Sequence, residues 1–331
     1  MTTEVLLVSH SRDGHREAYI HQFQALLHEA GYSCRVVDTW KATLDFAGPA
    51  CFLMIEENFF GYAIAAIVRA LQGRRTAGLL FRGREAAEGQ SLKLRNKAFL
   101  LCVMKSLTPV TTMSIVSFSV LPSIARVADD WIDDPQLWDI EDLSTPPSPL
   151  SADLVDLAAG RNILVALGAQ NREKGFDILA RTWLEKPEIR SRWLFVAAGK
   201  VAPSAWDIAN AFAEAGGGLV DRYVSDDELR SLYGAATVIW ALYAPDYDQA
   251  SGIFGRAVQY EKPVLLREGS AMANHAAQIA ARATTATYND AGSVILGLEA
   301  AAVSPAQNQR HSHLMRERSQ ALVFAALGKA H

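Results

Sequence analysis

Residues 161–179, RNILVALGAQNREKGFDIL, contain a short apolar run, a polar loop and a helical stretch in succession. The apolar run ends at Gly168, and Gly175 opens the helical stretch that continues as FDILARTWLE. A short apolar run is typical of a buried strand, and a loop bounded by glycines turns the chain toward a helix. The stretch therefore predicts one strand–loop–helix unit of a parallel sheet that is covered by helices.

The same alternation recurs along the chain. The runs RWLFVAAG, GLVDRYV, ATVIWALY and KPVLLR follow downstream, and EVLLVSH, a helical stretch and CRVVD stand near the N-terminus. Residues 143–154, LSTPPSPLSADL, hold three prolines and three serines, a composition that marks a linker. We therefore predict an α/β chain of two Rossmann-like, doubly wound parallel-sheet domains facing a cleft, over residues 1–148 and 149–305. An amphipathic helix is expected over 306–331.

Composition narrows the class of protein. At 331 residues the chain exceeds what one core usually supports, and half of its residues are hydrophobic, as in a well-cored protein. The net charge of -4 argues against general affinity for nucleic acid. Cys34, Cys51 and Cys102 have no metal-ligand spacing and lie in or beside apolar runs, which predicts buried, reduced thiols. No secretory signal or bilayer-spanning run is evident, so a cytoplasmic protein is expected.

Two cations follow the strand predicted before Gly168. Arg172 and Lys174 stand in the loop between this strand and the next helix. A lysine supplies a point charge and an arginine a planar fork of donors, so that both suit a diphosphate. An ordinary solvated turn is the alternative interpretation.

A helix start further along predicts a second anion-binding feature. In residues 246–264, DYDQASGIFGRAVQYEKPV, Ser251 or Gly252 begins a helix whose first backbone N–H groups are free to bind an anion. Asp248 lies just outside this start, where it could accept hydrogen bonds from sugar hydroxyls, and Arg256 lies one turn inside. Between the two features, Ser225 and Glu228 have the spacing of a capping box and are interpreted as structural.

In this order and spacing, these segments resemble the C-terminal domain of the family-4 glycosyltransferases, which have the GT-B architecture. The resemblance covers about residues 160–270, and the first 150 residues only in architecture. It implies a donor domain that binds a nucleoside diphosphate sugar, an acceptor domain before it, retention of anomeric configuration, and no metal or other cofactor. It further implies that the tail helix crosses back onto the first domain.

The resemblance also assigns roles to individual residues. Lys174 matches the lysine that holds the donor diphosphate, and Asp248 the first acid that contacts the donor sugar. Ser251 and Gly252 match the phosphate-facing turn, and Val224 the backbone that meets the base, while Gly168 ends the first strand of the donor domain.

Two positions depart from the family pattern. Ala169 replaces the family's loop arginine, whose charge Arg172 could supply instead. Arg256 replaces the second acid, which usually holds the ribose hydroxyls; a guanidinium cannot accept those hydrogen bonds, although it could bind phosphate or pair with Asp248. These departures favour a first alternative, a non-catalytic GT-B partner or scaffold subunit. A second alternative is a nucleotide-sugar 2-epimerase, for which no acid–base set is evident in the sequence.

Candidate acceptor residues follow two strands of the N-terminal half. The first strand leads into the loop SHSRDGHREA, and IEENFFG ends a strand near residue 55, where Glu56 or Glu57 could meet an acceptor hydroxyl. Turn and capping roles are the alternatives. The loop residues that could line the acceptor side are His10, Arg12, Asp13, Gly14 and His15.

The charge is unevenly distributed. Residues 69–105 hold nine basic side chains against two acidic ones, with Lys93, Arg95 and Lys97 beside Phe99. A solvated face is one interpretation. Because acceptors in the family are often lipid-linked, the resemblance implies the other, peripheral contact with an anionic membrane surface.

Overall fold

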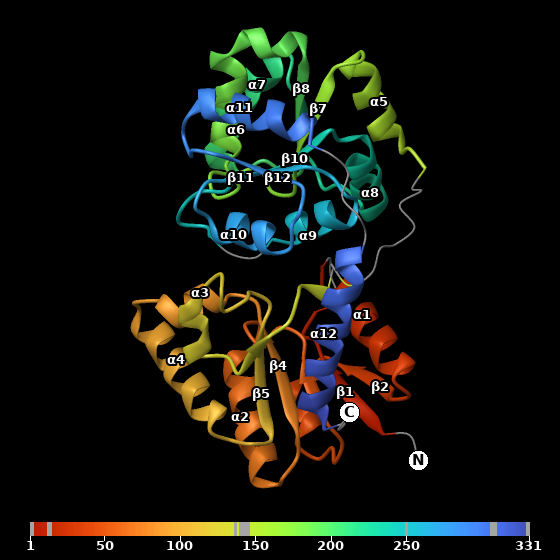
Figure 1. Cartoon of the computed structure of the whole chain (residues 1–331), viewed down its shortest axis with the longest axis vertical. Helices are drawn as coiled ribbons and strands as arrows, with labels where there is room; N and C mark the ends of the chain where they lie inside the picture. The colour runs from red at the N-terminus through yellow and green to blue at the C-terminus, as the bar shows by residue number, and fades with distance from the viewer. Residues whose placement is uncertain are drawn as a thin grey trace. The chain divides into compact units, whose positions relative to one another are not determined.

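The computed structural model describes residues 3–11, 15–135, 138, 146–248, 251–304 and 310–328. The chain divides into two compact units (Figure 1). Unit 1 comprises Met1–Asp139 together with Arg310–His331, and unit 2 comprises Ile140–Gln309. Each unit is built around one parallel sheet.

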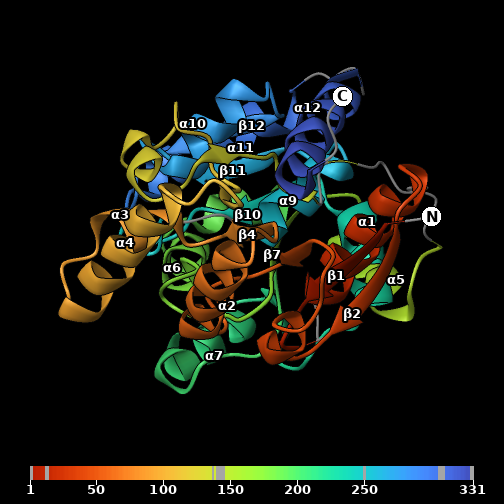
Figure 2. The same ribbon diagram turned by 90° about the horizontal axis from the view of Figure 1, so that it is seen from below.

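The sheet of unit 1 has the strand order β2-β1-β3-β4-β5-β6. Its strands are β1 (Glu4–Val8), β2 (Ser33–Val37), β3 (Ala50–Phe52), β4 (Thr76–Leu80), β5 (Val110–Ser114) and β6 (Asp130–Trp131). Its helices are α1 (His15–Glu29), α2 (Phe59–Leu71), α3 (Gly83–Glu88), α4 (Leu92–Lys105) and α12 (Arg310–Leu327). Right-handed crossovers place α1 on one face and α2 and α4 on the other (Figures 1 and 2).

The sheet of unit 2 has the order β12-β11-β10-β7-β8-β9. Its strands are β7 (Asn162–Leu167), β8 (Trp193–Ala198), β9 (Gly218–Val220), β10 (Val238–Ala241), β11 (Val264–Arg267) and β12 (Ala283–Ala286). Its helices are α5 (Pro149–Ala158), α6 (Phe176–Glu185), α7 (Trp206–Glu214), α8 (Asp226–Ala235), α9 (Gly252–Gln259), α10 (Ala271–Gln278) and α11 (Ala291–Ala302). Because the strands are parallel, their carboxyl ends meet at one edge, which we call the carboxyl edge.

Buried tryptophans link the core of unit 2 to its loops. Trp183, Trp193 and Trp240 are almost fully buried within one apolar cluster. The indole N–H of Trp240 donates to the carbonyl of Lys174 at 3.0 Å, so that the apolar ring fills the core while its polar end holds a loop.

The tail helix α12 packs on unit 1. Arg318 lies over the Trp131 ring at 3.5 Å, and the Ser319 hydroxyl accepts from the amide of Asp133 at 3.0 Å. The predicted fold class, two Rossmann-like parallel-sheet domains with a tail helix that returns to the first, is thus confirmed. None of the helices described is long and apolar enough to span a bilayer.

Candidate functional site

The carboxyl edge of unit 2 begins with a close approach of two loops. Gly168 follows β7 and Gly199 follows β8, both with positive φ. A Cβ at Gly199 would lie 1.9 Å from the carbonyl oxygen of Gly168, so only glycine allows this passage. The two loops therefore have a fixed position at the edge where ligands bind in such sheets.

The loop from β7 to α6 holds the predicted cations in different environments. Gly175 has a φ of 70°, and a Cβ there would lie 2.1 Å from the carbonyl oxygen of Leu242, which fixes the end of the loop. Arg172 is exposed and pairs with Asp246, with 2.9 Å between Nη1 and Oδ2. Such an exposed pair is weak and can exchange partners.

Lys174 is half-buried, and its ammonium lies against two tyrosine rings. Its Nζ is 4.4 Å from the ring centroid of Tyr243 and 5.2 Å from that of Tyr247. Burial alone would lower the pKa of Lys174, but Tyr243 and Tyr247, together with Glu173, outweigh it and leave the pKa above its ordinary value. The side chain therefore carries a positive charge at neutral pH.

The second predicted feature, the start of α9, lies beside the same tyrosine. Ser251 caps the helix by accepting from the amide of Phe254 at 3.4 Å, and Gly252 is the first helical residue. The Ser251 hydroxyl also shares a hydrogen bond of 3.0 Å with the Tyr243 hydroxyl. The partial positive charge of the helix start thus adjoins the residue that packs on Lys174.

Asp248 and Arg256 have partners within unit 2. The Asp248 carboxylate pairs with Arg267 at 3.2 Å and accepts from the amide of Ala271 at 2.9 Å. Arg256 donates to the side-chain oxygen of Gln259 at 3.3 Å. Asp248 thus anchors the loop after β10 to the start of α10.

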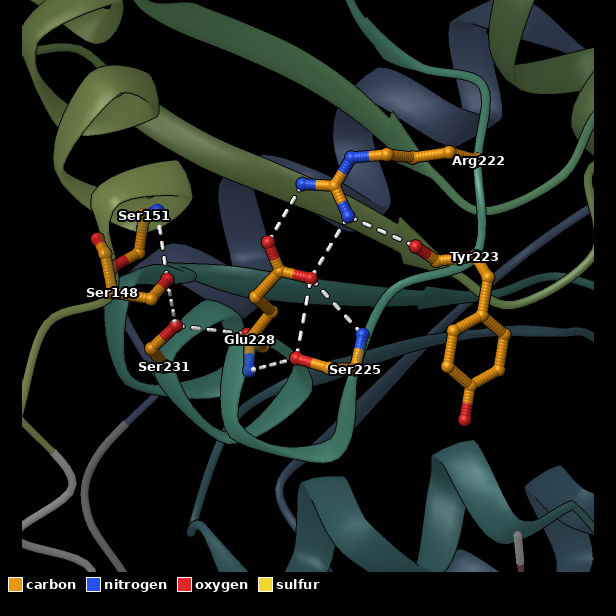
Figure 3. Close-up of polar contacts among 7 residues, drawn as sticks. All are labelled: Ser148, Ser151, Arg222, Tyr223, Ser225, Glu228 and Ser231. Carbon is orange, nitrogen blue, oxygen red and sulfur yellow. Dashed lines mark hydrogen bonds and ion pairs between the residues drawn. The ribbon is translucent and has the colours of Figure 1, made fainter. Parts of the chain in front are cut away.

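Val224 lies in the loop from β9 to α8. The ion pair of Arg222 with Glu228 stabilises this loop (Figure 3). The two terminal guanidinium nitrogens of Arg222, Nη2 and Nη1, donate to the Glu228 carboxylate at 2.7 and 2.9 Å. Hydrogen bonds from Arg222 and from the Ser225 amide lower the pKa of Glu228 to about 2. The predicted capping box of Ser225 and Glu228 is confirmed.

This loop presents an aromatic ring, Tyr223, followed by the backbone N–H and carbonyl of Val224. Tyr223 is 77% exposed, and its carbonyl accepts from Arg222 at 2.9 Å. Figure 3 shows its ring directed away from the Arg222–Glu228 pair. Val224 is buried, yet within the described part of the chain its backbone N–H and carbonyl bind no other residue.

In unit 1, the predicted acceptor residues that the structure describes follow β1 and the neighbouring β3. The amide of His10 donates to Glu57 at 3.3 Å, and Arg16 also pairs with Glu57. Arg12, Asp13 and Gly14 lie outside the described residues, and α1 begins at His15.

Glu56 and His10 each have a buried polar atom in the side chain. The Oε1 of Glu56 accepts from the amide of Arg82 at 2.6 Å. Its Oε2 and the Nε2 of His10 are shielded from solvent and have no hydrogen-bond partner among the residues described. Burial raises the pKa of the Glu56 carboxyl, although Lys97 opposes the shift.

The basic region over 69–105 is only partly a surface feature. Arg69 is fully buried, and its guanidinium donates to backbone carbonyls that include those of Phe46 and Arg75, so its inclusion in a surface patch is wrong. Lys97 is half-buried beside the Phe59 ring at 5.3 Å. Lys93 and Arg95 are exposed on α4.

Nothing in the sequence marks Tyr223, Tyr243 and Tyr247 as site residues. The first two stand in apolar runs that predict strands, and nothing local distinguishes them from core residues. One signal does indicate Tyr243. It lies two residues beyond the end of β10, and a residue that follows a parallel strand is expected near the carboxyl edge.

The fold was compared with those of known proteins. No protein-family model and no curated protein sequence matches the chain. Among solved structures, a trehalose-6-phosphate synthase of E. coli bound with UDP-2-fluoro glucose is similar with a TM-score of 0.63 and 8% identity, covering 98% of this chain and 96% of that one. WaaG, a glycosyltransferase involved in lipopolysaccharide biosynthesis, is similar with a TM-score of 0.56 and 12% identity, covering 98% of this chain and 100% of that one.

A third similar structure is a putative UDP-N-acetylglucosamine 2-epimerase from Listeria monocytogenes. Its TM-score is 0.64 at 12% identity, covering 100% of this chain and 98% of that one. The chain therefore has the fold of the GT-B glycosyltransferases, which this epimerase shares.

Proposed function

We propose that the protein is a retaining, metal-independent glycosyltransferase that moves a sugar from a nucleoside diphosphate sugar to a glycan or lipid-linked glycan acceptor. The observation that supports it most is the meeting of Lys174, Tyr243 and Ser251 at the carboxyl edge of unit 2. An ammonium and a helix start there lie against one tyrosine, and both attract phosphate oxygens.

Each residue has a role in this proposal. Lys174 and the amides at the start of α9 bind the donor diphosphate, and Arg172 joins them when it leaves Asp246. In the reaction, the bond between the anomeric carbon and the diphosphate oxygen breaks while an acceptor hydroxyl oxygen attacks on the same face. The leaving phosphate takes the acceptor proton. Donors placed at the growing negative charge contribute a few kcal/mol each to lowering the barrier.

The base is proposed to lie at the loop from β9 to α8. The N–H and carbonyl of Val224, which bind no other residue among those described, match the donors and acceptors at the edge of a base, and the exposed Tyr223 ring offers a stacking surface. In unit 1, we propose that Oε2 of Glu56 and Nε2 of His10, which have no partner within the described ranges, bind an acceptor hydroxyl, since a buried unsatisfied polar atom costs about 1–3 kcal/mol.

Thermal-shift measurements with UDP, GDP, ADP and their sugars test the donor site. We expect one nucleotide to raise the melting temperature of the wild type and of Lys186→Ala, but not of Lys174→Ala. Lys186 is the matched control because it caps the far end of α6. If no nucleotide stabilises the wild type, the non-catalytic scaffold is favoured instead.

The epimerase is a second candidate because one similar structure is described as a putative 2-epimerase. The protein incubated with the stabilising nucleotide sugar alone distinguishes the two. Conversion to the 2-epimer without an acceptor would support the epimerase, whereas acceptor-dependent release of nucleoside diphosphate would support the transferase.

We further propose a cytoplasmic protein whose unit 1 contacts an anionic membrane surface. The outer face of α4 exposes Leu92, Phe99 and Val103 beside Lys93 and Arg95. Binding to phosphatidylglycerol vesicles should fall when Lys93 and Arg95 become serine. It should persist when Lys186 and Arg192 of unit 2 are changed in the same way, and equal binding by both variants would contradict the proposal.

A further inference from the structure

Tyr243 contacts both parts of the proposed phosphate site. The residue is 3% exposed and follows the end of β10 by two positions. Its ring lies under the Lys174 ammonium, with 4.4 Å between Nζ and the ring centroid, and its hydroxyl lies 3.0 Å from the Ser251 hydroxyl. One buried side chain therefore joins the loop from β7 to α6 with the cap of α9.

Tyr247 completes the surroundings of the ammonium. Its ring centroid is 5.2 Å from Nζ and 5.9 Å from that of Tyr243, at an interplanar angle of 64°. Two ring faces attract a cation and so offset part of what it loses when it leaves water. The two tyrosine rings thus stabilise the charge of Lys174, a side chain that is half-buried.

The backbone around Lys174 is held independently of these rings. Its amide donates to Asn171 at 2.9 Å, and its carbonyl accepts from the Trp240 indole. The loop therefore keeps its path when Tyr243 is changed, and only the direction of the lysine side chain depends on the tyrosines.

We propose that Tyr243 is a positioning residue, which holds the Lys174 ammonium and the Ser251 hydroxyl in the arrangement that receives the diphosphate of a nucleotide. Tyr247 shares the first of these tasks. This inference rests on the proposed function, and it adds that the phosphate-binding groups are placed before the ligand arrives. A site assembled in advance binds more tightly because less side-chain freedom is lost on binding.

Two substitutions separate the tasks of Tyr243. Tyr243→Phe keeps the ring beside Lys174 but removes the hydrogen bond to Ser251. Tyr243→Leu removes the ring as well as the hydrogen bond. We expect the dissociation constants for the nucleotide that stabilises the wild type and for inorganic pyrophosphate to rise about threefold to tenfold in the first variant, as for one lost hydrogen bond. In the second we expect a rise of about tenfold to a hundredfold, because the cation–π contact is lost as well.

Tyr62→Phe in unit 1 is the matched control. Tyr62 is also buried, and its hydroxyl bonds to that of Thr112 at 2.8 Å. This variant should lose stability as Tyr243→Phe does, but its affinity for nucleotide and pyrophosphate should remain that of the wild type.

A pH profile adds a readout that a merely structural role would not change. The groups that act on the Lys174 charge include Tyr243, Tyr247 and Glu173. With Tyr243 removed, burial is less opposed, so the pKa of Lys174 falls. As the pH is raised, Lys174 loses its proton and the affinity for pyrophosphate declines. This decline should begin at a lower pH in Tyr243→Leu than in the wild type, and it should be absent in Lys174→Ala.

The outcomes distinguish this inference from the function on which it rests. If both Tyr243 variants bind every probe as the wild type does while Lys174→Ala does not, the positioning role is overturned and the phosphate site stands. If the wild type binds neither nucleotide nor pyrophosphate, both fall. Should Tyr243→Leu fail to fold, Tyr243→Phe against Tyr62→Phe decides the matter.

Discussion

Asp248 and Arg267 form an ion pair at the carboxyl edge of unit 2, with 3.2 Å between Oδ2 and Nη2 and side-chain exposures of 5% and 13%. Arg267 also donates to the carbonyl of Tyr243 at 3.1 Å. The acid expected to contact the donor sugar is therefore also part of the scaffold of its own loop. Its role in the scaffold predicts a loss of stability on substitution.

Asp248→Ala should destabilise the protein by about 3 kcal/mol, because it leaves the Arg267 charge nearly buried without its partner. Urea unfolding measures this loss, and Arg267→Met completes a double-mutant cycle. We expect the double variant to lose less than the sum of the two single variants by more than about 1 kcal/mol. Additive losses would show that the pair is not coupled.

Gly199→Ala should prevent stable folding of unit 2, or destabilise it by at least about 3 kcal/mol. The added Cβ would lie 1.9 Å from a backbone oxygen, at a φ of 140° that other residues rarely adopt. Gly234→Ala is the control, because Gly234 lies in α8 with open space at its Cβ. It should stabilise the protein by up to about 1 kcal/mol. Thermal unfolding of both variants tests the contrast, and equal melting temperatures would contradict it.

The parts of the fold that the sequence predicted are those with local causes. The apolar run after Arg161 is β7, Gly175 caps α6, and the spacing of Ser225 and Glu228 forms the capping box. Run length, glycine and side-chain spacing act within a few residues, so one segment of sequence holds the whole signal. Parallel, right-handed connections limit the strand orders that are possible, but the observed orders come from the structure and not from these local signals.

Contacts between distant segments could not be predicted in this way. Arg69 counts as a basic residue in the sequence, but in the fold it is enclosed by carbonyls, including those of Thr43, Gly48 and Arg75. The pairing of Asp248 with Arg267 and the packing of Lys174 on Tyr243 likewise join separate loops. Charge and hydropathy patterns describe what a residue is, whereas its neighbours are decided by tertiary structure.

His275 should make stability fall in mild acid. Burial lowers its pKa from 6.5 to about 4, so the folded protein keeps this imidazole neutral. As the pH falls, the unfolded chain binds a proton at this histidine before the folded protein does. The free energy of unfolding is therefore at its full value above pH 6.5 and decreases as the pH falls toward 4. The loss is at most about 3 kcal/mol.

Urea unfolding between pH 7 and 4 tests this expectation. His275→Gln should lack the His275 part of the decline, and His21→Gln, which changes an exposed histidine of α1, should keep the wild-type slope. Identical slopes in all three proteins would show that His275 does not titrate differently on unfolding.

Tyr223→Ala should weaken binding of the nucleotide that stabilises the protein by about fivefold to a hundredfold, since stacking of a base on an aromatic ring contributes about 1–3 kcal/mol. The Arg222–Glu228 pair holds the loop without the ring of Tyr223, so the variant should keep the wild-type melting temperature (Figure 3). Tyr223→Trp should bind the nucleotide as well as the wild type or better.

Pyrophosphate, which has no base, should bind Tyr223→Ala and wild type alike by calorimetry. A loss of equal size for pyrophosphate would mean that Tyr223 supports the phosphate site, and no loss for the nucleotide would remove the base from this loop.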